Sequence, residues 1–133
     1  MAYLLDTHTL LWLLFEPKKL STDVTTILKN RRNKAFVSLV TFWEIATKLK
    51  IGKLSLSGLT IVDIKKECKK LGFKILPISF EDIQEYLSLP LFKNHRDPFD
   101  RMLIASSIQK ELTLISCDTK LSQYSNTKLT FLW

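Results

Sequence analysis

The sequence contains little glycine and little cysteine. Its three glycines form neither a GxGxxG fingerprint nor a GxxxxGK phosphate loop, which disfavours nucleotide cofactors and P-loop chemistry. The two cysteines, Cys68 and Cys117, do not form a CxxC pair, and with only two histidines beside them no zinc-like ligand set can be read from the spacing. We expect both cysteines to be buried, reduced thiols.

Long apolar runs are also missing. The longest uninterrupted one extends from Leu10 to Phe15, far short of the roughly 20 residues that span a bilayer. The first residues, MAYLLD, include no basic leader, so we expect a soluble, cytoplasmic protein. A length of 133 residues with 46% hydrophobic content fits one domain, residues 1–133, around a single packed core.

Positive charge exceeds negative charge along the chain. The formal net charge is +7, and the excess lies in segments such as residues 29–34, 48–53 and 65–70. A basic surface neutralises backbone phosphates whatever the base sequence, which favours a nucleic acid partner. Solvated helix faces carry the same kind of charge, so both interpretations stay open on charge alone.

Short apolar runs alternate with amphipathic stretches of helical period. The pattern predicts strands at residues 2–5, 35–38, 73–78, 112–116 and 128–132, and helices at 7–15, 22–32, 41–51, 61–71, 80–89, 98–110 and 119–124. Pro77 indicates a strand end or an edge strand. This alternation predicts an α/β fold with a central, mostly parallel sheet of four or five strands, flanked by helices on both faces.

Four acidic residues lie where a predicted strand ends or a predicted helix begins: Asp6, Glu44, Asp100 and Asp118. The carboxyl ends of parallel strands and the adjacent helix starts share one sheet edge, so we expect these side chains to converge. Two carboxylates about 4 Å apart repel by roughly 4 kcal/mol at the effective dielectric of a protein surface. Four ionised together need a counter-charge, and a divalent cation is the usual one.

Each acid also has a purely structural interpretation. Asp6 and Asp118 can cap the helices that follow them, and Glu44 precedes Lys48 by one helical turn, the favourable order for an ion pair. However, the residues around Glu44 are apolar, which places this acid near a wall of the core.

The segment from Asp97 to Asp100 is typical of a helix start. Asp97 can cap the helix, Pro98 suits its first position, and Asp100 favours the helix dipole. Capping explains one of these acids well and two less well, because both lie on the same side of the first turn. Arg101 can pair with Asp97 or contact a phosphate. His95 is interpreted as a loop residue, with metal ligation or substrate contact as its alternative.

Three aromatic residues occur at helical core spacings: Trp12, Trp43 and Phe99. We expect them to pack inside the protein, and we keep base stacking as the second interpretation.

Four blocks of the sequence resemble the PIN-domain family. They are LLDTH at residues 4–8, WEI at residues 43–45 with Lys48, HRDPFDRMLIA at residues 95–105, and ISCD at residues 115–118. The resemblance covers nearly the whole chain, and the block at 95–105 is its most specific part. It is closest to the VapC-like toxin ribonucleases of bacterial type II toxin–antitoxin modules.

The resemblance implies a metal-dependent endoribonuclease that hydrolyses RNA phosphodiester bonds with Mg²⁺ or Mn²⁺. By motif, the catalytic and metal-binding residues are Asp6, Glu44, Asp100 and Asp118, with Asp97 as a further candidate ligand. Supporting roles fall to Thr7, Ser116, Lys48 and Arg101. Ser116 stands where the family often has threonine, and its hydroxyl can orient a carboxylate or a water. Lys48 and Arg101 would contact RNA phosphates.

The resemblance further implies a homodimer, a cognate antitoxin that lays a peptide over the acidic groove, and no membrane association. Two alternatives remain at this stage. One is a PIN nuclease that acts in RNA processing or DNA metabolism without an antitoxin. The other is a non-catalytic RNA-binding module in which the acids only cap helices and the lysines bind phosphate.

Overall fold

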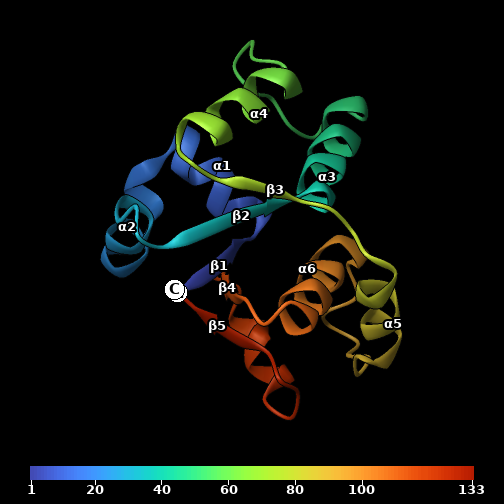
Figure 1. Ribbon diagram of the computed structural model, residues 1–133. Helices are drawn as coiled ribbons and strands as arrows, with labels where there is room; N and C mark the ends of the chain where they lie inside the picture. The colour runs from blue at the N-terminus through green and yellow to red at the C-terminus, as the bar shows by residue number, and fades with distance from the viewer.

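A computed structural model describes residues 1–133 (Figure 1). One sheet contains β1 (Ala2–Leu5), β2 (Lys34–Ser38), β3 (Lys74–Leu76), β4 (Thr113–Ile115) and β5 (Thr130–Leu132), in the order β3-β2-β1-β4-β5. Every neighbouring pair of strands is parallel, which confirms the predicted α/β fold. β3 ends just before Pro77 and lies at an edge of the sheet, as the proline predicts.

The helices cover both faces of this sheet. They are α1 (Thr7–Phe15), α2 (Thr22–Lys29), α3 (Leu39–Lys50), α4 (Ile61–Lys70), α5 (Phe80–Ser88) and α6 (Pro98–Gln109), with 3-10 turns η1 (Pro17–Lys19) and η2 (Thr119–Tyr124). In Figure 1, α1 and α4 lie on one side of the sheet and α5 and α6 on the other. None of these helices has the length and apolar character needed to cross a membrane.

Alternation along the strands divides the core between the two faces. In β1, Leu4 belongs to the hydrophobic cluster that includes Leu103 and Ile104 of α6. The next residue, Leu5, belongs to the cluster formed with α1, α3 and α4. Successive side chains of a strand point to opposite faces, so the central strand anchors both helical layers and fixes the loops that follow it.

Two residues expected inside lie nearer the surface. Trp43 is 62% exposed, and its ring meets that of Phe99 edge-on at 5.0 Å between centroids. α3 buries the face that contains Val40 and Ile45, which turns Trp43 toward solvent, so the prediction of a packed Trp43 is wrong. Of the two free thiols, Cys68 is buried and Cys117 is only partly buried.

Candidate metal centre

Two of the four acids follow the neighbouring central strands β1 and β4. Asp6 caps α1 by accepting a hydrogen bond from the Thr9 amide at 2.8 Å. Asp118 caps η2 by accepting from the Lys120 amide at 2.9 Å. The two strand ends are tied together, since the carbonyl of Ile115 accepts from the Asp6 amide and the Thr9 hydroxyl. These two acids therefore lie at one edge of the sheet.

The start of α6 contributes Asp97 and Asp100. One oxygen of Asp97 accepts from the amides of Phe99 and Asp100 at 2.8 and 3.1 Å, so Asp97 is the helix cap that the sequence predicts. The Asp100 carboxylate is partly buried, and no protein group donates a hydrogen bond to it. A partly buried carboxylate without a donor lacks the usual compensation for its lost hydration.

Glu44 projects from α3 and is 2% exposed. The hydroxyl of Thr7 donates to its Oε1 at 2.6 Å, and Lys48 Nζ donates to its Oε2 at 2.6 Å. The predicted ion pair with Lys48 is therefore present, and it lies against the wall of the acidic site. A buried carboxylate with both oxygens engaged is held in a single orientation.

The acids face one another across a small pocket. Asp6, Asp100 and Asp118 line it together with His95 and Ser116. Burial, followed by the charges of Asp97, Glu44, Asp6 and Asp118 in that order, raises the pKa of Asp100 to about 7. Neighbouring carboxylates have this effect only at short range. The convergence expected from the strand ends is thus present, and Glu44 lies beside the pocket without lining it.

Lys48 is a partly exposed cation beside this group. Burial alone would lower its pKa, but the hydrogen bond and the charge of Glu44, followed by Asp97 and Asp100, outweigh that effect and raise it. Because Lys48 is already paired with Glu44, the negative charge around Asp100 remains largely uncompensated. The donor set is made of hard carboxylate oxygens, which suit Mg²⁺ or Mn²⁺.

A family model of the PIN domain matches residues 3–126. The chain belongs to the PIN domain family. No curated protein sequence matches it.

Solved structures confirm the PIN fold over the whole chain. VapBC2 from Rickettsia felis, bound to a DNA fragment from its promoter, is 15% identical, with a TM-score of 0.68 and coverage of 99% of this chain and 98% of that one. VapBC-1 from Haemophilus influenzae is 18% identical, with a TM-score of 0.67 and coverage of 99% and 97%. VapBC-5 from Mycobacterium tuberculosis is 14% identical, with a TM-score of 0.59 and coverage of 98% and 97%.

In this PIN domain the side chain of Arg101 points away from Asp97 and from the pocket. Its side chain is 4% exposed, and Nη1 donates to the carbonyl of Pro90 at 2.8 Å and to the hydroxyl of Tyr124 at 3.2 Å. The guanidinium also lies over the ring of Tyr86. Arg101 therefore does not pair with Asp97, and its burial gives no support to the predicted phosphate contact.

His95 lies in a loop, as predicted, but its side chain is buried. It is 4% exposed, with Nδ1 at 2.8 Å from the Tyr124 hydroxyl and Nε2 at 3.0 Å from Asp118 Oδ2. Ligand atoms of His95, Asp100 and Asp118 lie within 4.8 Å of one another. The sequence offered one signal for this position, namely its membership of the HRDPFDR block.

Ser116 supports the backbone of the site. It is 4% exposed, and its Oγ accepts a hydrogen bond from the Asp118 amide at 3.1 Å. The predicted orienting role thus takes a different form, because the hydroxyl fixes the main chain at Asp118 and does not touch its carboxylate.

Proposed function

We propose that this PIN domain is an endoribonuclease that depends on Mg²⁺ or Mn²⁺ and acts as the toxin of a type II toxin–antitoxin module. The Asp100 carboxylate is the observation that supports this most strongly. It is partly buried and has no hydrogen-bond donor, and this burial together with four further acids around it raises its pKa to about 7. A folded chain retains such a cluster at a cost in stability, and a bound divalent cation removes that cost.

Helix capping supports the rival interpretation, in which the chain is a non-catalytic RNA-binding module. Asp6, Asp97 and Asp118 all cap helices, so capping accounts for them without a metal. It does not account for Glu44, which lies in the middle of α3, or for Asp100, whose carboxylate accepts no backbone bond. These two acids favour the nuclease.

In the proposed enzyme Asp6, Asp100 and Asp118 would hold the ion, with Glu44 beside them and Asp97 as a further candidate ligand through its free oxygen. A bound Mg²⁺ or Mn²⁺ would supply Lewis acidity and activate water for phosphodiester hydrolysis. Thr7 keeps Glu44 in place, and Ser116 fixes the backbone that presents Asp118.

Lys48 would guide the RNA backbone toward the acids. Its side chain is 35% exposed, and it lines a groove with Lys53, His8 and Trp12 that runs beside Thr7. Two lysines at the border of an acidic pocket can hold the phosphates that flank the cleaved bond.

Cleavage assays with the purified chain test the proposed activity. We expect single-stranded RNA to be cut with Mn²⁺ or Mg²⁺, and we expect EDTA to abolish the reaction. Calorimetry should detect Mn²⁺ binding without RNA. If Mn²⁺ neither binds nor supports cleavage, the nuclease proposal fails. Equal cleavage of single-stranded DNA would instead favour a PIN nuclease of DNA metabolism.

The affinity for Mn²⁺ should depend on pH because Asp100 must lose its proton to bind a cation. Its pKa is raised to about 7, so protons compete with the ion below that pH and cease to compete above it. We expect Mn²⁺ to bind about tenfold more weakly at pH 6 than at pH 8. Calorimetry in buffers of different ionisation enthalpy measures this change and the proton release that accompanies it. An affinity that does not vary between these pH values would contradict the raised pKa.

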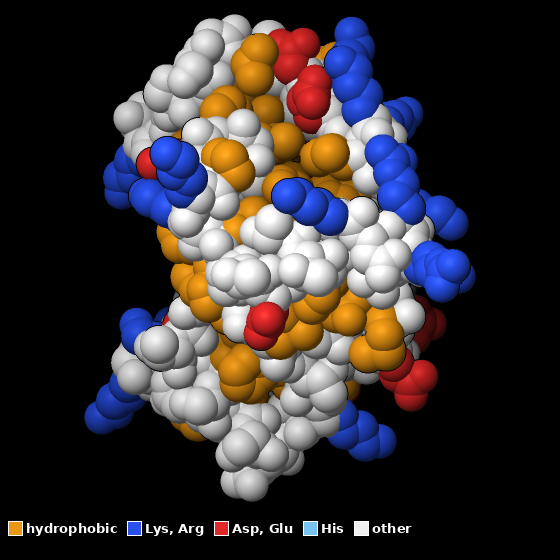
Figure 2. All heavy atoms as spheres, turned by 90° about the vertical axis from the view of Figure 1, so that its left-hand side faces the viewer, with side chains coloured by type: hydrophobic (Ala, Val, Ile, Leu, Met, Phe, Trp, Pro, Cys, Tyr) orange, Lys and Arg blue, Asp and Glu red, His pale blue; other side chains and the backbone are white.

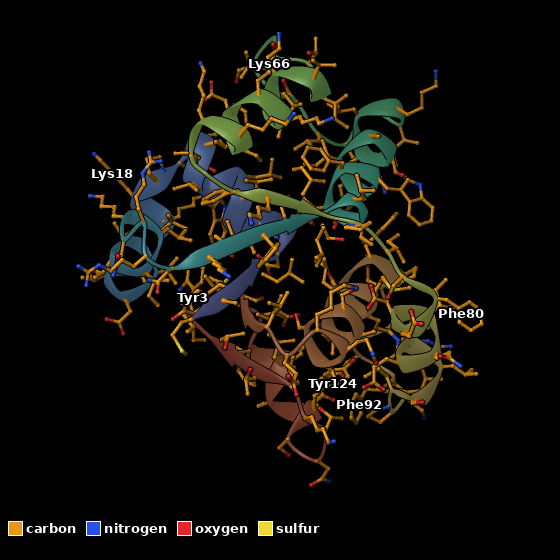
Figure 3. The ribbon with its side chains drawn as sticks, in the orientation of Figure 1. Tyr3, Lys18, Lys66, Phe80, Phe92 and Tyr124 are labelled. Carbon is orange, nitrogen blue, oxygen red and sulfur yellow. The ribbon has the colours of Figure 1, made fainter.

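A second copy of the chain is the partner proposed for α5. Phe80, Ile83 and Leu87 are 69%, 51% and 87% exposed and form one stripe at helical spacing. Figure 3 shows Phe80 pointing away from the body of the protein. A stripe of this kind pairs well with its own copy across a two-fold axis, which supports a homodimer.

Charge placed on the α5 stripe should dissociate this dimer. We expect Ile83→Glu to yield a monomer in light scattering coupled to size-exclusion chromatography, because it introduces a desolvated charge into the contact. Ser88→Glu is the matched control, since it adds the same charge at an exposed position of the same helix, about 100° around the axis from Leu87, and it should remain dimeric. A wild-type chain that is monomeric at high concentration would refute the proposal.

The proposed antitoxin would cover the acids, and an apolar groove of this chain offers it a second contact surface. The structural relative from M. tuberculosis belongs to the VapBC family of toxin–antitoxin systems. Figure 2 shows hydrophobic side chains bordered by lysine and arginine on one face of this chain. An apolar groove of the chain is lined by Leu13, Leu20, Leu28 and Phe73, with Lys29 and Arg31 beside them. An amphipathic, acidic partner fits that surface. A small protein encoded beside this gene should inhibit RNA cleavage on mixing.

A further inference from the structure

A chain of buried hydrogen bonds leads from α6 to the acidic pocket. Arg101 donates from Nη1 to the carbonyl of Pro90 and to the hydroxyl of Tyr124. The Tyr124 hydroxyl lies 2.8 Å from His95 Nδ1, and His95 Nε2 lies 3.0 Å from Asp118 Oδ2. Tyr124 is 1% exposed, and His95 and Arg101 are each 4% exposed. Water therefore has little access to the chain of bonds.

The direction of these bonds follows from what each group can donate. A guanidinium has no acceptor, so Arg101 donates to the Tyr124 oxygen. The hydroxyl proton of Tyr124 then needs an acceptor of its own, and His95 Nδ1 is the one within reach. If Nδ1 accepts, a neutral His95 carries its proton on Nε2. That proton points at Asp118 Oδ2, which can only accept.

We propose that His95 is a positioning residue that donates its Nε2 proton to Asp118, and that Tyr124 and Arg101 hold it in this tautomer. The alternative is that His95 itself binds the cation, since its nitrogen lies close to Asp100 and Asp118. A nitrogen that carries a proton has no lone pair for a metal. The direction of the hydrogen bonds, which Arg101 sets, therefore favours a positioning role for His95 over metal ligation.

The position of Asp118 shows what such a bond does. Its side chain is 32% exposed, and it lies in the loop after β4, so its carboxylate is free to rotate unless both oxygens are held. The Lys120 amide holds Oδ1 and His95 holds Oδ2, and each oxygen keeps a further lone pair that can bind a cation. Partners of this kind orient ligands and raise metal affinity.

The tautomer can be read directly by nitrogen NMR of the metal-free protein. We expect the ¹⁵N shifts and couplings of His95 to identify a protonated Nε2 and an unprotonated Nδ1. In Tyr124→Phe, which keeps the aromatic packing but removes the hydroxyl, the population of the other tautomer should rise. His8 is exposed and provides an internal reference for a histidine without a hydrogen-bonded partner in the protein. A wild-type His95 protonated on Nδ1 would overturn the proposal.

Substitutions at His95 separate positioning from ligation. The amide of His95→Gln reaches about the same place as Nε2 and can donate to Asp118, whereas His95→Leu cannot. We expect His95→Leu to weaken Mn²⁺ binding by about 10- to 100-fold, and His95→Gln to recover most of that loss. Equal losses in both variants indicate direct ligation, and no loss in either indicates a purely structural histidine; each overturns the proposal. Thermal melts confirm that each variant is folded.

This inference rests on the proposed metal site but not on the nuclease activity. If the wild type binds Mn²⁺ and the His95 variants behave as expected, the positioning role stands even when no RNA is cut. If RNA is cut but the tautomer is the opposite one, the positioning role fails and the nuclease stands. The NMR and binding measurements therefore distinguish the two failures.

Discussion

Asp100→Asn is expected to produce a protein that is more stable than the wild type and no longer cuts RNA. In the metal-free protein the pKa of Asp100 is raised to about 7 from the ordinary value of 3.8. A carboxyl with a raised pKa contributes stability that is fully present below the unfolded pKa and is lost as pH rises through the folded pKa. Above pH 7 the ionised Asp100 therefore opposes folding, and asparagine removes that effect.

The size of the gain in stability follows from the difference between the pKa of Asp100 in the folded protein and its ordinary value. We expect the free energy of unfolding at pH 8 in EDTA to rise by about 2 kcal/mol, roughly half of what the full difference gives, because solvent screens a partly exposed carboxylate. At pH 5 the gain should be smaller, since Asp100 of the folded wild type is then protonated. Urea unfolding at the two pH values measures the difference. A loss of stability at pH 8 would contradict this account.

The same substitution should remove activity because Asp100 is a proposed ligand. Loss of a residue that only supports a metal ligand typically lowers metal affinity or activity by about 10- to 100-fold. Because Asp100 is proposed as a ligand itself, we expect Asp100→Asn to lower RNA cleavage by at least about a hundredfold. Asp23→Asn is the control, because Asp23 lies in the first turn of α2, far from the pocket, and it should cut RNA normally. Asp97→Asn preserves a good cap and tests whether that acid also binds the ion. Unchanged cleavage by Asp100→Asn would refute its assignment.

Asp82→Ala is expected to cause the largest loss of stability. Asp82 is fully buried and accepts hydrogen bonds from the Ser79 amide, the Ser106 hydroxyl and Lys110. Alanine leaves Lys110 without its partner and breaks the capping box that begins α5. Loss of one member of a buried pair costs about 3–5 kcal/mol. We expect the lower end, because Lys110 remains 24% exposed, and a fall in Tm of roughly 10 °C.

Two controls identify the source of this loss. Glu81→Ala changes the neighbouring exposed acid and should leave Tm nearly unchanged. The double variant Asp82→Leu with Lys110→Met removes both charges, and it should recover much of the stability, because a matched apolar pair avoids the unpaired buried charge. A double variant as unstable as Asp82→Ala would show that the hydrogen bonds of Ser79 and Ser106, and not the charge, are responsible.

The pair between Asp82 and Lys110 also predicts how the loss of stability in Asp82→Ala depends on pH. Burial alone would raise the pKa of Asp82, but the bonds from Lys110, Ser79 and Ser106 outweigh it and lower the pKa below 3.8. A group with a lowered pKa stabilises the fold above its unfolded value and loses that contribution as pH falls through the folded value. The destabilisation by Asp82→Ala should therefore be full at pH 6 and should shrink below about pH 4.

The architecture was predictable because it depends on local patterns. Apolar runs of strand length, a proline at the end of β3 and serine or aspartate before helices all act over a few residues, so their order gives the alternation of strands and helices. The convergence of Asp6, Asp100 and Asp118 also follows, because parallel strands bring their carboxyl ends to one edge.

The contacts of Arg101 and His95 were not predictable in the same way. Arg101 is adjacent to Asp100 in sequence, but one helical step turns it by about 100°, away from the pocket and toward Tyr124. The bond that defines His95 joins it to Tyr124, 29 residues later. Asp82 was missed for a similar reason, since its partner Lys110 comes from another helix. Pairings of this kind depend on packing and leave no periodic signal.

The strand order has a consequence for when the protein becomes active during its own synthesis. β1 is made before the other strands of the sheet, yet its neighbour β4 and the acid that follows it, Asp118, are made only after β2, β3 and α6. A growing polypeptide on the ribosome therefore lacks one wall of the acidic pocket, and β1 has an open edge until residues 113–115 emerge. Incomplete chains released by stalled ribosomes would carry most of the acids but could not assemble the centre. The topology thus delays a proposed RNA-cutting activity until the ribosome has made the last acid of the centre, Asp118.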